Sequence, residues 1–126
     1  MATITTTLTD GTVYSRITSA AFTYAVEVAD TVGKERAFLE GKLKQVDRLV
    51  QVRLEQGEPE TSAQYAAQAK EMRETLEALA NVSDDEVYRY YIIRESSTLE
   101  AANKAANGYR AKGTYCSVKV LPLERS

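Results

Sequence analysis

Apolar residues in the middle of the chain recur at intervals of four and then three positions, and they form two separate stripes. The stripes consist of Leu39, Leu43, Val46 and Val50 and, further along, Tyr65, Ala69, Met72, Leu76 and Leu79. This spacing places each stripe on one face of an α-helix, close to the repeat of a coiled-coil seam. Residues 56–62 (QGEPETS) lie between the stripes and indicate a turn. Residues 30–82 are therefore predicted to form a long antiparallel helical hairpin.

The first 29 residues have a β pattern. Residues 3–18 predict a β-hairpin, because Ile4, Thr6 and Leu8 alternate with threonines and residues 12–17 are of β-favouring types. Asp10-Gly11 between them is a two-residue turn signal, since both residues tolerate positive φ. Residues 20–29 fit two patterns, because Phe22, Val26 and Ala29 would also share one face of a helix. Bulky residues at every second position favour a third strand. The segment 1–29 is therefore expected to be a β-hairpin or a three-stranded meander.

The last third of the chain indicates a strand, a helix and a second strand. Residues 86–94 (EVYRYYIIR) favour a strand, Gly113 ends the helical pattern, and residues 115–121 form another strand pattern. Short connections between such elements are typical of a βαβ unit. In the last strand, Cys116 alternates with Val118 and Val120, which predicts a buried thiol.

Two sites have the spacing of a capping box, in which a hydroxyl side chain and a residue three positions later bind free N–H groups at a helix start. They are Thr61 with Gln64 and Ser97 with Glu100. The fold expected from all these patterns is α+β. A single domain over residues 1–126 contains the β-rich segment 1–29, the helical hairpin 30–82 and the βαβ unit 83–126, and the three segments share one core.

The amino-acid composition excludes several kinds of chemistry. The chain of 126 residues has a net charge of −2, no histidine and one cysteine. These counts exclude Ser-His-Asp and Cys-His catalysis, histidine-ligated metals, thiolate zinc clusters and iron–sulfur clusters. Glycine-rich phosphate loops are also absent from the sequence. We therefore expect no catalytic residue, no cofactor and no metal, and we predict that the protein is not an enzyme.

The same sequence features indicate where the protein resides. No apolar run approaches the roughly 20 residues that a membrane-spanning helix needs. The first residues lack the basic start and apolar core of a signal peptide, and one cysteine cannot form an internal disulfide. A cytoplasmic location, or assembly within a cytosolic particle, is the expectation, with no membrane partner.

Three residues beside the first stripe indicate a site for a partner. Phe38, Leu49 and Val52 widen the apolar surface of the first helix beyond what one neighbouring helix covers. Either the sheet or another subunit can cover this surface. The resulting hypothesis is a non-catalytic protein–protein interaction or assembly subunit that associates with itself, as part of a homo-oligomer or a larger particle.

An alternative hypothesis involves the strand over residues 87–94. Tyr88 and Tyr90 lie next to Arg89 and Arg94, and aromatic residues on a sheet can stack on the bases of single-stranded nucleic acid. The two tyrosines also fit a buried or interface position, because this strand is apolar on both faces. The small net charge favours the second interpretation over nucleic-acid binding.

Overall fold

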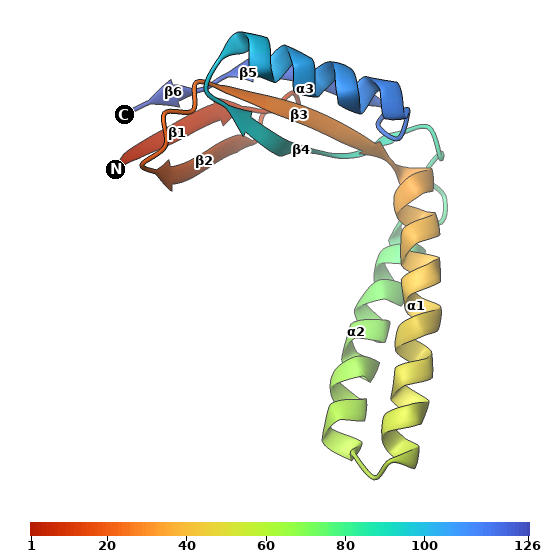
Figure 1. Cartoon of the computed structure of the whole chain (residues 1–126). Coiled ribbons are helices and arrows are strands. Elements are labelled where there is room, and N and C mark those ends of the chain that lie inside the picture. The colour runs from red at the N-terminus through yellow and green to blue at the C-terminus, as the bar shows by residue number, and fades with distance from the viewer. The chain divides into compact units, whose positions relative to one another are not determined.

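The computed structural model describes residues 1–126, which form two compact units. Residues 1–31 and 87–126 make up the first, here called the β-rich unit, and residues 32–86 make up the second, here called the hairpin unit. Figure 1 labels six strands and helix α3 in the β-rich unit and helices α1 and α2 in the hairpin unit. The predicted α+β class is confirmed. That these segments make up a single domain stays a prediction.

The predicted N-terminal β-hairpin is confirmed. β1 (Ala2–Thr7) pairs antiparallel with β2 (Val13–Thr18), and the short β6 (Glu124–Arg125) pairs with the other edge of β1. The connection between β1 and β2 differs from the predicted two-residue turn. Residues 8–12 lie outside the ladder, and the N–H of Gly11, whose φ is +90°, donates to the carbonyl of Leu8 at 2.9 Å. The N–H of Leu8 still donates to the carbonyl of Thr12 at 2.8 Å, so the chain reverses over residues 9–11.

The ambiguous segment 20–29 contains a strand, as the bulky alternation favoured. β3 (Tyr24–Thr31) is the central strand of a second sheet and lies antiparallel to both β4 (Val87–Ser96) and β5 (Ser117–Pro122). Since both neighbours run opposite to β3, β4 and β5 run parallel to each other but do not touch. The predicted βαβ unit is therefore split, with β3 inserted between its two strands. Residues 25–30 of β3 are buried, as expected for a central strand.

Helix α3 (Leu99–Lys112) covers one face of the second sheet (Figure 1). Its Ala106 packs with Val26 and Val28 of β3 in the core of the β-rich unit. The helix begins one residue later than the predicted capping box implies. Thr98, not Ser97, is the N-cap, and its hydroxyl accepts a hydrogen bond from the N–H of Ala101 at 3.1 Å. The helix ends at Gly113, as predicted.

The hairpin unit consists of α1 (Val32–Glu55) and α2 (Pro59–Ala78). The capping box predicted at Thr61 and Gln64 is wrong, because α2 begins at Pro59 and its N-cap, Glu58, makes no side-chain cap. Proline suits the first helical position, where the missing N–H would have no partner within the helix. The hydroxyl of Ser62 instead donates to the carbonyl of Val50 on α1 at 2.9 Å. No helix of the protein has the length and apolar character needed to cross a membrane.

The prediction of a buried thiol at Cys116 is also wrong. Cys116 is exposed and lies just before β5, which begins at Ser117. Its N–H and its Sγ both bind the carbonyl of Ala29, at 3.0 and 3.3 Å. The alternation with Val118 and Val120 fails at this residue because the strand has not yet begun, so its side chain does not follow the pleat.

Candidate functional site

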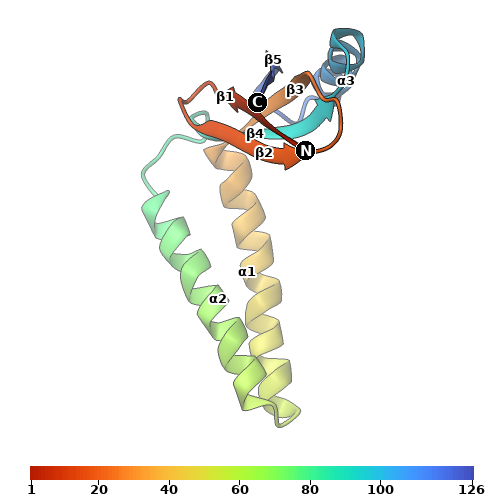
Figure 2. The same ribbon diagram turned by 90° about the vertical axis from the view of Figure 1, so that its left-hand side faces the viewer.

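The seam between α1 and α2 is built from the most buried residues of the two predicted stripes. Leu39 and Val46 of α1 and Ala69 of α2 are buried, and the small side chain of Ser62 is buried near the loop. Both views of the ribbon show the two helices side by side and antiparallel (Figures 1 and 2). The two buried residues of α2, Ser62 and Ala69, both have small side chains. The seam is therefore a structural contact within the chain.

The loop that joins the helices fixes their antiparallel order. Gly57 has φ +73°, and the N–H of Glu58 donates to the carbonyl of Arg53 at 2.8 Å, which satisfies a carbonyl at the end of α1. Arg53 also forms an ion pair with the Glu58 carboxylate at 2.9 Å. Glu58 raises the pKa of the Arg53 guanidinium by accepting this hydrogen bond.

A second line of residues runs along α1 beside the seam. Phe38, Lys42, Gln45, Leu49 and Val52 follow one another at intervals of four and three positions. Phe38 is 58% exposed, and Leu49 and Val52 are half-buried. The three residues proposed from sequence as a partner surface therefore lie on one line of α1.

The surface beside Phe38 is hollowed. A hollow of about 480 Å³ is lined by Ala37, Phe38, Gly41, Lys42 and Gln45, all from α1. Gly41 contributes to the hollow because it has no side chain, and a Cβ at this position would meet no atom within 4 Å. The ammonium of Lys42 lies 5.7 Å from the centre of the Phe38 ring. A ring next to a hollow is a shape into which a side chain of a partner helix can pack.

Helix α2 carries a matching line. Tyr65, Met72 and Leu79 belong to the predicted stripe of α2, but they are only half-buried and lie to one side of the buried Ala69. They are spaced seven positions apart and end just beyond the last turn of α2. An ion pair shows on which side of the hairpin this line lies. Arg73 of α2 binds Asp47 of α1 at 2.6 Å. On α1, Asp47 and Leu49 lie on opposite sides of the seam, and on α2, Arg73 and Met72 do so too. The lines of both helices therefore share one side of the hairpin, and the ion pair lies on the other side. The side with the two lines is here called the apolar face, although Lys42 and Gln45 occupy the middle of its α1 line.

Tyr88 and Tyr90 belong to the β-rich unit and are half-buried on β4. Their neighbour Arg89 lies over the ring of Tyr91, with its Cζ 4.8 Å from the ring centre, and its Nε is 3.9 Å from the Asp30 carboxylate. Tyr91 packs against the core next to Val28. Burial, followed by the charge of Asp30, raises the pKa of Tyr91 to about 12. Nucleic-acid binding by this strand stays a prediction.

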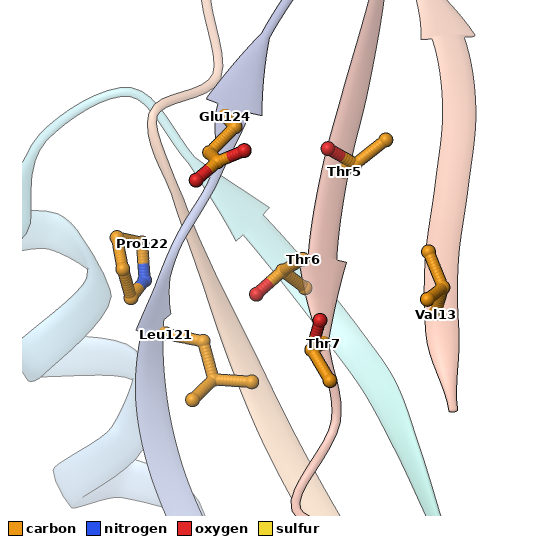
Figure 3. A pocket seen from close by; sticks show the side chains of 7 residues that line it. All are labelled: Thr5, Thr6, Thr7, Val13, Leu121, Pro122 and Glu124. Carbon is orange, nitrogen blue, oxygen red and sulfur yellow. The ribbon is translucent and has the colours of Figure 1, made fainter. Parts of the chain in front are cut away.

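A pocket of about 320 Å³ lies in the β-rich unit, where β1 diverges from β5. Figure 3 shows the three threonines of β1 between Val13 on one side and Leu121, Pro122 and Glu124 on the other. The lining residues are Thr5, Thr6, Thr7, Val13, Leu121, Pro122 and Glu124. This lining contains hydroxyls and one carboxylate but no cationic side chain. Across the chain, no three His, Cys, Asp or Glu residues are grouped so that they could hold a metal ion.

Two carboxylates bind polar groups across the β-rich unit in ways that the sequence pattern did not indicate. Glu27 is fully buried on β3 and accepts hydrogen bonds from the N–H and the hydroxyl of Thr9, at 2.8 and 2.6 Å. Glu95 accepts a hydrogen bond from the Tyr14 hydroxyl at 2.9 Å and pairs with the Arg16 guanidinium. Burial, followed by the Glu95 hydrogen bond, raises the pKa of Tyr14. Both carboxylates tie the loop or strand of the N-terminal hairpin to the second sheet, so their role is structural.

Comparison of the chain with protein-family models, with curated proteins and with solved structures gave no match.

Proposed function

We propose that the protein is a non-catalytic assembly subunit that binds another protein chain through the apolar face of its helical hairpin. The observation that carries this proposal is the line of Phe38, Leu49 and Val52, which stands beside the seam and not within it. The composition of the chain supports a location in the cytoplasm or in a cytosolic particle.

Burial energetics support the apolar face as the binding surface. Two packed helices cover only one side of each other, so a pair with a second apolar line gains free energy when another surface covers that line. Burying a side chain such as Phe, Leu or Val fully contributes about 1.5–3 kcal/mol. Phe38 is more than half exposed, so most of this contribution remains available to a partner.

The chain offers a matched pair of substitutions for testing the face. Val52 lies on the apolar face, whereas Leu54 is 51% exposed and lies seven positions after Asp47, on the side of the ion pair. Val52→Glu and Leu54→Glu place the same charge two residues apart on opposite sides of the hairpin. We expect Val52→Glu to abolish association and Leu54→Glu to preserve it.

Two measurements decide the outcome. Light scattering gives the mass of each variant in solution, and immobilised variants capture proteins from the native source, with circular dichroism as a check that each is folded. An oligomer or a captured protein that is lost with Val52→Glu and kept with Leu54→Glu supports the proposal. If the unmodified chain is a monomer and captures nothing that Val52→Glu does not also capture, the proposal is overturned.

A further inference from the structure

We infer that the partner on the apolar face is a second copy of this chain, with α1 of each copy packed along α2 of the other in an antiparallel four-helix bundle. This inference rests on the proposed function, because it names the occupant of the same face. Three properties of the hairpin lead to it: the charges of its helices, the register of its apolar lines and the area of its face.

The two helices carry opposite charges. α1 contains six Lys and Arg against four Asp and Glu, a net charge of +2, while α2 contains two against four, a net charge of −2. When two identical hairpins meet face to face, α1 can lie over the partner's α1 or over the partner's α2. The first arrangement brings like charges together twice, and the second brings opposite charges together twice. Charge complementarity therefore selects the arrangement in which α1 lies over the partner's α2.

The register of the hairpin makes this arrangement self-complementary. Within the chain, Asp47 pairs with Arg73, and Ser62 binds Val50, so each residue of α1 lies level with a short range of α2 that these two contacts bracket. A two-fold axis parallel to the helices keeps these levels. Phe38 then lies opposite residues 74–82 of the partner, which include Leu79, and Val52 lies opposite residues 60–68, which include Tyr65. Apolar residues meet apolar residues at both ends of the face, and the hollow beside Phe38 can accept a side chain of the partner's α2.

The face is large enough for a specific contact between two copies. α2 has 20 residues, which gives a length of about 30 Å, and two helices side by side are about 20 Å wide. The face therefore covers about 600 Å² per copy, or about 1,200 Å² in total, at the lower end of the range for stable specific interfaces. An interface of this size predicts a dimer that dissociates on dilution.

Sedimentation equilibrium over a range of concentrations tests whether the occupant is a second copy. We expect a reversible equilibrium between the 14.0 kDa chain and a species of twice that mass. Val52→Glu should weaken the dimer at least about a hundredfold, because the dimer would bury two unpaired charges. The matched Leu54→Glu variant should dimerise like the unmodified chain.

A charge-reversal cycle tests the arrangement. Arg48 of α1 and Glu71 of α2 are exposed and border the apolar face on its two outer edges, so they are far apart within one chain and close together between copies. We expect Arg48→Glu and Glu71→Arg each to weaken the dimer by about tenfold, since each reversal affects two pairs. The double variant should recover the affinity to within about threefold.

The outcomes separate this inference from the proposed function. A chain that stays monomeric at every concentration overturns the inference, while the capture experiment with Val52→Glu still decides the proposed function. A dimer that Val52→Glu does not weaken uses another surface and overturns the inference. A dimer that Val52→Glu weakens but that neither charge reversal affects overturns the packing of α1 on the partner's α2.

Discussion

Gly33 lies in the first turn of α1, where the backbone of the segment after α2 passes close by. A Cβ atom at this position would come within 2.9 Å of the Asp84 Cβ and 3.2 Å of the Asp84 carbonyl oxygen. The N–H of Gly33 donates to that same carbonyl at 3.1 Å. The first turn of α1 is thus capped by backbone carbonyls of a distant segment. A side chain at position 33 would push this segment away from the start of α1.

The first prediction concerns this contact. Gly33→Ala should lower the free energy of unfolding by about 1–3 kcal/mol, because overpacking outweighs the gain in helix propensity. Gly108→Ala is the control, since a Cβ there meets nothing within 4 Å, and it should raise the free energy of unfolding by about 0.5–1 kcal/mol. Urea unfolding of the two variants measures both values. Equal effects of the two substitutions would contradict the close approach at Gly33.

The second prediction concerns Tyr91, whose pKa is raised to about 12. A raised pKa means that the folded protein favours the neutral phenol. Its contribution to stability is therefore complete below the ordinary value of 10.0 and is lost as the pH rises through about 12. Tyr91→Phe removes this ionisation, so the stability of the variant should fall less steeply between these pH values. Thermal melts across this range test the difference, and parallel curves for the two proteins would contradict it.

At the scale of elements, the turn between α1 and α2 depends on one backbone conformation. Gly57 has φ +73°, a region that residues with a Cβ adopt at a cost. The third prediction is that Gly57→Ala lowers the free energy of unfolding by about 1 kcal/mol, whereas Gly57→Asn has a smaller effect because asparagine tolerates this region. Thermal unfolding of the two variants gives the comparison, and an alanine variant as stable as the asparagine variant would contradict it.

The starts of the helices were less predictable than their faces. The stripes placed Leu39, Val46 and Ala69 correctly in the seam, because burial follows directly from helical periodicity. The capping boxes misplaced two helix starts, because several hydroxyl residues near each start have suitable spacing. Helix α2 begins at Pro59, which suits the first helical position. The Ser62 hydroxyl does not cap the helix but donates a hydrogen bond to the carbonyl of Val50 on the neighbouring helix.

At the scale of the whole molecule, self-association links stability to concentration. If the folded chain dimerises through the apolar face and the unfolded chain does not, a higher concentration stabilises the folded form by mass action. The fourth prediction is a melting temperature that rises with protein concentration for the unmodified chain and for Leu54→Glu. For Val52→Glu it should be independent of concentration. Calorimetry at a series of concentrations provides the measurement, and a constant melting temperature for the unmodified chain would contradict the dimer.

Elements with a local signal could be predicted from the amino-acid sequence. Helical periodicity predicted the hairpin and the position of Phe38, Leu49 and Val52 beside its seam. The threonine alternation predicted β1, and β-favouring residues predicted β2. These features depend on residues a few positions apart, so a single stretch of chain contains the whole pattern.

Features that join distant parts of the chain became visible only in the folded structure. The insertion of β3 between β4 and β5 could not be predicted, because a strand pattern does not specify its neighbours. The burial of Glu27 depends on Thr9, and the exposure of Cys116 depends on where β5 begins. In the hairpin, the Asp47–Arg73 ion pair showed that the apolar lines of α1 and α2 lie on the same side. The physical reason is the same in each case: periodicity reports which face of an element is apolar, while the partner of that face is set by contacts between residues far apart in sequence.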